Sequence, residues 1–444
     1  MSEKPTPDDY PSMAMALPEG VDFEEYVVAT YFGEISANMG ISWKVAQAIA
    51  IEQSTGTWVC VPGETPEVRR RHVAKVLSVS QIPDYEFERP GPKEEPYRTY
   101  ILQIGFPAEN VWNTLGLLLT AIFGNISMAG RLKMLDVRFP KKWLAEFKGP
   151  KFGIEGIRKL LKVPERPLLN NMIKPCIYDS IKVGSELFYQ AAVGGCDIIK
   201  DDELLANQAF NPISERIPAY MEMVDRAKSE KGEETLFTVN ITDRMPNMLE
   251  NADKAIELGA NALMVNYPVV GLEIVRQICE DPSVKVPVLG HMDFAGAMYM
   301  APQYGVSSHL ILAKFPRIAG CDILVHPAPY GKASVLNDKF ERVAHTCRMP
   351  LHNIKPMFPM PSGGITVGMV DKCVESLGPD IVIGSGGGIH AHPDGAAAGA
   401  KAFRQAIDAV MQGIKVKDYA KDHKELGVSL GTWGTGKIEM GKKY

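Results

Sequence analysis

The feature that most restricts the fold is the regular alternation, from Gly149 onward, of short apolar runs with helix-length segments. Eight runs have strand length: Leu168–Ile173, Ile198–Lys200, Leu236–Ile241, Ala262–Val265, Val286–Gly290, Ile323–Val325, Pro356–Met360 and Ile381–Ile383. Amphipathic segments predict helices over Gly184–Val193, Ile217–Lys228, Met248–Leu258, Gly271–Cys279, Ser307–Ile318, Asn337–Thr346, Thr366–Leu377 and Gly395–Met411. Because parallel strands need a long crossover, this spacing predicts a (β/α)₈ TIM barrel.

The chain before Gly149 has a different pattern, typical of a small α+β domain of ferredoxin-like type. The expected strands there are Glu24–Tyr31, His72–Val79 and Tyr97–Gly105, and the expected helices are Ser42–Glu52 and Trp112–Gly124. We therefore divide the chain into a loose arm (1–22), an N-terminal α+β domain (23–150), a TIM-barrel domain (151–435) and a tail (436–444).

Composition excludes several classes of protein. The net charge of −5 and the lack of a basic stripe argue against a nucleic-acid partner. No apolar run reaches the roughly 18 residues of a membrane span, and the first residues do not resemble a secretory signal. The seven cysteines contain no CxxC pair, so we expect reduced thiols and a cytoplasmic protein.

Every predicted barrel strand ends in, or is soon followed by, a polar residue or a glycine cluster. In chain order these are Lys174, Lys200-Asp201-Asp202-Glu203, Asn240 with Thr242, Asn266, His291, His326, Ser362-Gly363-Gly364 and Gly386-Gly387-Gly388. The carboxyl ends of TIM-barrel strands form the active-site mouth. The eight strand ends together therefore predict a catalytic site, although any one of them alone would be unremarkable.

The run Lys200-Asp201-Asp202-Glu203 indicates a metal site. Side chains alternate along a strand, so Lys200 and Asp202 share one face and Glu203 follows at the turn. Two inward carboxylates suit Mg²⁺. An ammonium would repel the ion, whereas a carbamate formed from Lys200 and CO₂ would supply a third anionic oxygen. A solvated charge cluster is the alternative interpretation, and the strand context disfavours it.

The paired and triple glycines after strands 7 and 8 predict a phosphate site. Glycine lets backbone N–H groups approach an anion, and this corner of a TIM barrel commonly binds phosphate. The predicted chemistry is enolisation, because Mg²⁺ beside a carbonyl stabilises an enolate. Three groups could move the proton: Lys174, whose pKa we expect desolvation and the cation to lower, the free carbamate oxygen, and His291.

Several stretches resemble RuBisCO and RuBisCO-like proteins in the same order. They are Glu52-Gln53-Ser54-Thr55-Gly56-Thr57-Trp58, Phe123-Gly124-Asn125, Gly149-Pro150-Lys151-Phe152-Gly153-Ile154, Ile173-Lys174-Pro175, the Lys200 run, Gly290-His291, Val325-His326, Gly331-Lys332, Pro361-Ser362-Gly363-Gly364 and Gly386-Gly387-Gly388. The resemblance covers roughly residues 24 to 435. It implies a RuBisCO-like lyase or isomerase with Mg²⁺ and CO₂, the latter as a lysine carbamate.

The resemblance also implies roles for individual residues. Catalytic roles fall to Lys174, Lys200, His291, Lys332, Asn125 and Glu52. Substrate and phosphate contacts fall to Thr57, Trp58, His326, Ser362, Gly363, Gly364, Gly386, Gly387 and Gly388. It further implies a head-to-tail homodimer or higher homo-oligomer, in which the N-terminal domain of one chain completes the site of the other.

The departures from the carboxylase indicate a different substrate. Cys176 replaces the second lysine of the carboxylase KPK run, and Met292 replaces the arginine that binds its second phosphate. A phosphorylated keto compound with one phosphate and a neutral far end would fit better, since arginine forks usually hold phosphates. The Gly149-Pro150-Lys151-Phe152-Gly153 and Gly386–Pro393 stretches look closest to the methionine-salvage enolases.

One residue departs from those enolases as well. They use an N-domain lysine as general base where this chain has Asn125, so Lys174 or the carbamate would have to serve. An isomerase of a methylthioribulose-type phosphate and a β-keto decarboxylase would use the same enolate and stay open. Two further alternatives are a divergent ribulose-1,5-bisphosphate carboxylase and a non-catalytic regulatory paralogue, which should lack Lys200, Asp202 or Glu203.

Overall fold

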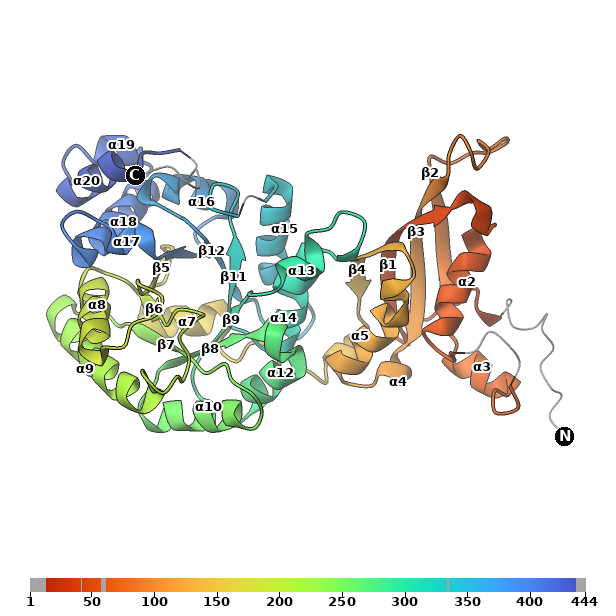
Figure 1. Cartoon of the computed structure of the whole chain (residues 1–444), viewed down its shortest axis with the longest axis horizontal. Helices are drawn as coiled ribbons and strands as arrows, with labels where there is room; N and C mark the ends of the chain where they lie inside the picture. Colours follow the sequence, from red (N-terminus) through yellow and green to blue (C-terminus); the bar gives the residue numbers. More distant parts are fainter. Residues whose placement is uncertain (1–12, 41, 57–60, 334, 437–444) are drawn as a thin grey trace. The chain divides into compact units, whose positions relative to one another are not determined.

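The computed structural model describes residues 13–40, 42–56, 61–333 and 335–436 (Figure 1). The chain forms two compact units. Unit 1 comprises the residues up to Phe147 together with Ala295–Ile311, and unit 2 comprises Lys148–Phe294 and the residues from Leu312 onward. The predicted combination of an N-terminal α+β domain and a barrel is confirmed.

Unit 1 is built on a five-stranded sheet in the order β10-β4-β1-β3-β2. Its elements are β1 (Tyr26–Ser36), α2 (Ser42–Glu52), α3 (Pro66–His72), β2 (Lys75–Ile82), β3 (Tyr97–Pro107), α4 (Ala108–Val111), α5 (Leu115–Phe123), β4 (Arg131–Arg138), α6 (Lys141–Leu144), α13 (Gly296–Tyr299) and β10 (Gly305–Val306). Strand β1 pairs antiparallel with both β3 and β4. Strand β4 was not predicted, although the buried Leu132, Met134 and Val137 give it a strand-like pattern.

Part of the predicted loose arm is packed against the sheet. Residues 1–12 lie outside the described residues, but Ala14 is fully buried and Met15 forms a parallel bridge to Val76 of β2. The backbone N–H of Ala16 donates to the Val76 carbonyl at 3.2 Å. This apolar segment therefore extends the edge of the sheet, because it offers both a buried side chain and free backbone groups.

Segment 295–311, which the sequence assigns to the barrel, belongs structurally to unit 1. Within it β10 pairs parallel with β4, and Lys133 of β4 donates to the carbonyls of Tyr299 at 2.9 Å and Ala301 at 2.5 Å. The helix predicted over Ser307–Ile318 is confirmed, since residues 308–319 are helical throughout, with a π-helical stretch at Leu310–Lys314 before α14 (Phe315–Ala319). Pro316 lies at the first positions of α14, where proline is well tolerated.

Unit 2 is the predicted barrel of eight parallel strands. They are β5 (Leu168–Met172), β6 (Ile198–Lys200), β7 (Leu236–Asn240), β8 (Ala262–Asn266), β9 (Val288–His291), β11 (Ile323–Pro327), β12 (Phe358–Ser362) and β13 (Val382–Ser385). The hydrogen-bonded order is β12-β11-β9-β8-β7-β6-β5-β13. The two end strands meet in space, since a Cβ added at Gly384 would lie 2.8 Å from Ser362 Oγ.

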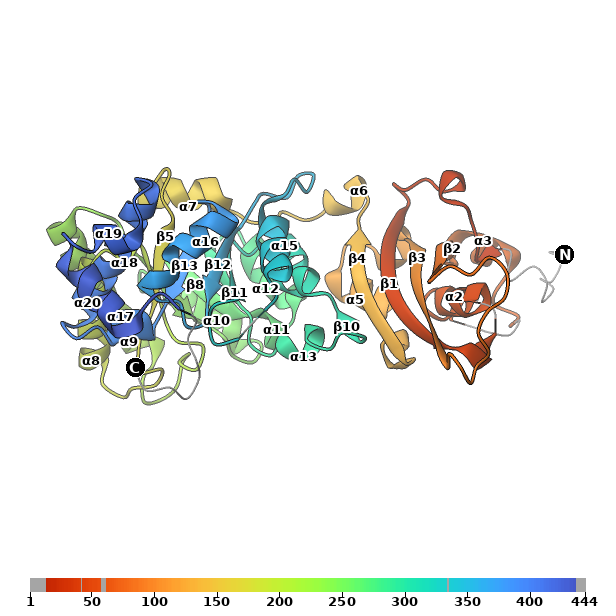
Figure 2. The same ribbon diagram turned by 90° about the horizontal axis from the view of Figure 1, so that it is seen from above.

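Helices surround these strands (Figure 2). They are α7 (Gly153–Leu161), α8 (Ile181–Val193), α9 (Ile213–Lys231), α10 (Asn247–Glu257), α11 (Tyr267–Val270), α12 (Leu272–Glu280), α14, α15 (Asn337–Arg348), α16 (Val370–Leu377), α17 (Gly387–His390), α18 (Ala396–Met411), α19 (Val416–Tyr419) and α20 (Lys424–Trp433). Among the described residues, none of the helices has the length and apolar character needed to cross a bilayer.

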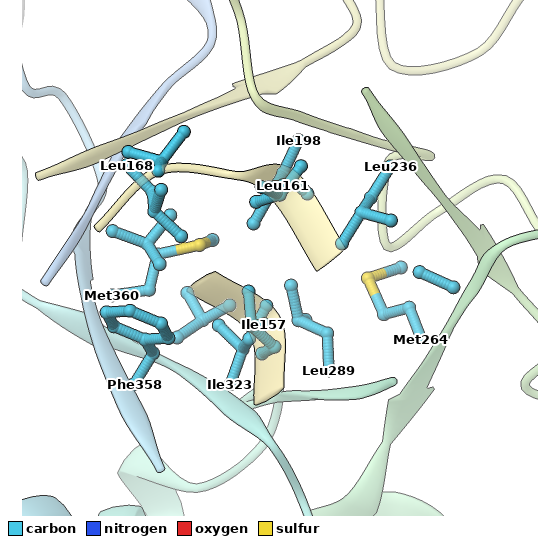
Figure 3. Close-up of a cluster of buried hydrophobic side chains, with 14 residues drawn as sticks. Ile157, Leu161, Leu168, Ile198, Leu236, Met264, Leu289, Ile323, Phe358 and Met360 are labelled. Atoms are coloured by element: carbon cyan, nitrogen blue, oxygen red, sulfur yellow. The ribbon is translucent and has the colours of Figure 1, made fainter. Parts of the chain in front are cut away.

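The barrel interior is a packed apolar core. Ile157 and Leu161 of α7 meet inward-facing side chains from all eight strands (Figure 3). The strand residues of this cluster are Leu168, Ile198, Leu236, Ala262, Met264, Leu289, Ile323, Val325, Phe358, Met360 and Val382. Because α7 precedes β5, it closes the amino-terminal end of the barrel and leaves the carboxyl-terminal end for polar side chains.

We predict that Lys133→Met loosens segment 295–311. The substitution leaves two backbone carbonyls without their charged donor, which costs about 2 kcal/mol and should speed local amide exchange roughly thirtyfold. Hydrogen–deuterium exchange of residues 299–306 measures the effect. The control is Lys142→Met, which removes an exposed ion pair with Glu25 of the same unit. Equal exchange in both variants would contradict the prediction.

Candidate active site

Strand alternation decides which side of β6 each charged side chain occupies. Ile198 points into the barrel core, so Lys200 lies on the same inward face two residues later. Asp201 lies on the opposite face, toward α9. The structure buries Lys200 completely and leaves only 2% of Asp202 exposed. The inward face of β6 thus delivers a buried lysine and a buried carboxylate to the mouth of the barrel.

Lys200, Glu203 and His291 form a chain of polar contacts. Lys200 Nζ lies 3.1 Å from Glu203 Oε2 and 2.9 Å from the Asp201 carbonyl oxygen. His291 Nε2 lies 3.5 Å from the same Glu203 oxygen, and His291 Nδ1 lies 3.0 Å from Asp293 Oδ2. Burial alone would raise the pKa of Glu203, but the neighbouring Lys200 and His291 outweigh it and lower that pKa to about 2.

Asp202 has a different lysine partner. Lys174 Nζ donates to Asp202 Oδ2 at 2.5 Å and to Cys176 Sγ at 2.9 Å. Burial lowers the pKa of Lys174, but its hydrogen bonds to Asp202 and Cys176 more than offset this, so the net pKa is raised. Desolvation therefore acts on the Lys174 pKa in the predicted direction, but direct pairing with Asp202 reverses the net shift.

The donor set fits Mg²⁺ only with a contribution from Lys200. In the part of the chain that the structure describes, no three His, Cys, Asp or Glu side chains are grouped to hold a metal. Asp202 and Glu203 supply hard carboxylate oxygens, as Mg²⁺ prefers, and each already contacts a lysine ammonium. A carbamate on Lys200 would turn the buried ammonium into a third oxygen ligand, as the sequence predicts.

A buried ion pair behind the β6 end was not predicted. Asp201 and Arg216 of α9 are both fully buried, and Arg216 Nη2 lies 3.0 Å from Asp201 Oδ2. Burial raises the pKa of Asp201, against the effect of the Arg216 guanidinium. The sequence signal was weak, because Arg216 lies just before the predicted start of its helix and nothing marks it as buried.

The glycine clusters bring four loops together. Gly363 and Gly364 have φ values of 88° and 98°, a region that other residues rarely adopt. The backbone N–H of Lys332 donates to the Gly363 carbonyl at 2.6 Å. A Cβ added at Gly386 would lie 3.0 Å from Lys174 Cε, and one at Gly364 would lie 3.0 Å from Lys332 Cγ. Lys174, Lys332 and the glycine turns therefore form one corner.

The remaining residues of the predicted phosphate corner differ in how open they are. Gly387 has no atom near an added Cβ, whereas Gly388 would place one 2.8 Å from the Ile365 carbonyl oxygen. Ser362, at the end of β12, is 3% exposed. Gly387, like Gly363, thus leaves open space above its turn, whereas the close packing of Gly388 holds the turn after β13 in place.

The structure does not bring His326 to this group. Ile323 and Val325 of β11 face the core, so His326 lies on the outward face. Its ring packs on Phe340 of α15, with centroids 5.4 Å apart. Burial lowers the pKa of His326 to about 4. His326 is therefore a neutral residue between strand and helix in this arrangement.

The other predicted site residues belong to unit 1. Asn125 Nδ2 donates to Glu52 Oε1 at 3.4 Å, so the structure brings these two side chains together. Glu52 ends α2, and Asn125 follows α5 in a short 3₁₀ turn, Asn125–Met128. Thr57 and Trp58 lie outside the described residues.

Comparison with known proteins identifies the family to which this chain belongs. Family models of the ribulose bisphosphate carboxylase large chain match residues 22–143 with the N-terminal domain and residues 153–433 with the catalytic domain. A ribulose bisphosphate carboxylase-like protein from Archaeoglobus fulgidus is 57% identical over 409 residues, covering 92% of this chain and 93% of the relative. A 2,3-diketo-5-methylthiopentyl-1-phosphate enolase from Geobacillus thermodenitrificans is 34% identical, covering 93% of this chain and 99% of the relative.

Solved structures show the same similarity. A rubisco-like protein from Alicyclobacillus acidocaldarius has a TM-score of 0.84 and 33% identity, covering 93% of this chain and 100% of the other. An octameric carboxylase from Pyrococcus horikoshii has a TM-score of 0.86 and 30% identity, covering 97% of this chain and 98% of the other. The chain thus belongs to the ribulose bisphosphate carboxylase large-chain family, as a RuBisCO-like enzyme near the methionine-salvage enolases.

Proposed function

We propose that this protein enolises a keto compound that carries one phosphate, with Mg²⁺ bound at Lys200, Asp202 and Glu203. The favoured substrate class is that of 2,3-diketo-5-methylthiopentyl-1-phosphate, which names several relatives. The family membership supports an enolase-type reaction.

The position of Lys174 is the observation that carries this proposal. Its Nζ contacts Asp202 at 2.5 Å, and its Cε borders the glycine turn at Gly386. Lys174 therefore lies between the proposed metal ligands and the proposed phosphate corner. A substrate with its phosphate at the turn and its carbonyl at the ligands would place the enolising carbon beside the Lys174 amine.

The chain's own residues would divide the work as follows. Bound Mg²⁺ would supply Lewis-acid polarisation of the substrate carbonyl. Lys174 is the proposed proton carrier, since its amine contacts Asp202 and its side chain borders the glycine turn at Gly386. His291 is held by Asp293 at 3.0 Å, which fixes its ring beside Glu203.

The far end of the site supports a substrate with one phosphate. Met292 directly follows His291, and its side chain packs against the apolar core of the barrel. A thioether cannot pair with a phosphate dianion, whereas an arginine fork would. Cys176, two residues after Lys174, contacts the Lys174 amine and adds no second cation. An apolar far end of the substrate, such as a methylthio group, suits these two residues.

Asn125 supports Lys174 as the proton carrier. An asparagine amide cannot act as the general base that a lysine provides at this position in the related enolases. In unit 1 the Asn125 side chain donates to Glu52. We propose that both residues act in the site of a second copy of the chain. Solved relatives described as dimeric and octameric carboxylases support a homo-oligomer.

The first test of this function is deuterium exchange in D₂O with Mg²⁺ and bicarbonate. We expect NMR to show exchange next to the keto group of 2,3-diketo-5-methylthiopentyl-1-phosphate, and its loss in Lys200→Ala. Ribulose-1,5-bisphosphate should show none, because Met292 and Cys176 provide no second phosphate site. Exchange and carboxylation of the bisphosphate would instead support a divergent carboxylase. Inactivity on both compounds and on 5-methylthioribulose-1-phosphate would argue for a non-catalytic protein.

A second test concerns the proton carrier. We expect Lys174→Met to lower the exchange rate by about 10²–10⁴-fold, the usual contribution of one general acid or base. The matched control is Lys162→Met, which removes a lysine at the opposite end of the barrel that pairs with Glu234 and is 75% exposed. If the Lys174 variant exchanges as fast as the control, the carbamate or His291 must move the proton instead.

A further inference from the structure

We infer that the buried pair of Asp201 and Arg216 is a positioning pair that holds Asp202 and Glu203 in the geometry a divalent ion requires. The inference rests on the proposed metal-dependent function. Asp201 stands between two proposed ligands, Lys200 and Asp202, but faces away from them toward α9. It therefore acts through the backbone of its neighbours and through the residues that its carboxylate binds.

Asp201 joins the ends of two strands. Its Oδ2 accepts from Arg216 Nη2 at 3.0 Å and from the backbone N–H of Asn240 at 3.0 Å. Asn240 is the last residue of β7. One carboxylate oxygen thus ties the end of β6 both to a helix outside the barrel and to the neighbouring strand end.

Asn240 carries this link to the proposed ligands. Its Nδ2 donates to the carbonyl of Asp202 at 3.3 Å and to the carbonyl of Glu203 at 3.2 Å. Asn266 of β8 adds a bond from its own Nδ2 to the Glu203 carbonyl at 3.4 Å. Asn240, which Asp201 binds through its backbone N–H, therefore holds the backbone of both carboxylate residues.

Arg216 anchors the loop that follows. Its Nη1 donates to the carbonyl of Asn211 at 2.6 Å and to Asn211 Oδ1 at 2.9 Å, and its Nη2 donates to the carbonyl of Ala206 at 2.5 Å. Asn211 in turn donates to the carbonyl of Tyr178 in the loop after β5. The guanidinium thus fixes the loop that leaves Glu203, and outer contacts of this kind orient metal ligands.

The same strand offers a matched control at its other end. Asp197, just before β6, is also fully buried and accepts from Arg166 at 2.7 Å through both carboxylate oxygens. It also accepts from the backbone N–H of Leu169 at 2.8 Å. Asp197 lies four residues from Asp201, roughly 13 Å along an extended strand. Asp197→Asn therefore damages a comparable buried pair without touching the ligand loop.

The experiment compares Asp201→Asn with Asp197→Asn by Mn²⁺ titration followed by electron paramagnetic resonance, with bicarbonate and without substrate. We expect Asp201→Asn to weaken Mn²⁺ binding about tenfold or more, the usual effect of losing an outer contact. Asp197→Asn should stay within about twofold of the wild type. Thermal unfolding should show that both substitutions lower stability, because each breaks a buried ion pair. Only the ion affinity then separates a positioning role from a structural one.

A second variant covers the case in which Asp201→Asn does not fold. Arg216→Lys keeps the charge but loses the fork that reaches Asp201, Asn211 and Ala206 together, and it should weaken Mn²⁺ binding in the same direction. Equal weakening by the Asp201 and Asp197 variants, or by neither, would overturn the positioning role while leaving the proposed function standing. If the wild type and Lys200→Ala bind Mn²⁺ equally, or neither binds it, both the positioning role and the proposed metal-dependent function would be overturned.

Discussion

The inward packing of strand side chains on α7 is the constraint on which the rest of the barrel depends. Ile157 and Leu161 fill the amino-terminal end of the barrel against residues from every strand (Figure 3). Because side chains alternate along a strand, burying Ile198 in that core forces Lys200 to point inward at the other end. A shift of β6 by one residue would turn Lys200 outward and point Asp201 into the mouth. Apolar packing at one end therefore sets the polar chemistry at the other.

The same alternation separates two kinds of buried charge. On the inward side, Lys174 contacts Asp202 at 2.5 Å and Lys200 contacts Glu203 at 3.1 Å. On the outward side, Asp201 faces Arg216 between strand and helix. Breaking a buried pair of this kind is costly, since it leaves an unpaired charge. The Asp201–Arg216 pair lies beside the proposed metal ligands. A rigid backbone is most useful there, because small displacements of ligands weaken a metal site.

Sequence reasoning recovered the barrel, its eight strands and the lysine and carboxylates at the strand ends, because local apolar patterns and chain order determine these. It started the strand at Val286, two residues too early, because the lead-in Val286-Pro287 is also apolar; the strand runs from Val288 to His291. It missed Arg216, because nothing local distinguishes a buried arginine from an exposed one. It predicted a lowered pKa for Lys174, because the contact with Asp202 joins residues 28 positions apart and cannot be read from the sequence.

By itself, the sequence determined the repeating βα pattern, the side-chain parity of each strand and the glycines that allow positive φ, since all of these are local properties of the backbone. Tertiary structure decided which side chains meet. It paired β10 of segment 295–311 with β4 of unit 1, turned His326 toward Phe340 and enclosed Asp201 with Arg216. Such contacts join residues far apart in the chain. Their free energy depends on how deeply the groups are buried and on the cost of removing them from water, which only the folded packing sets.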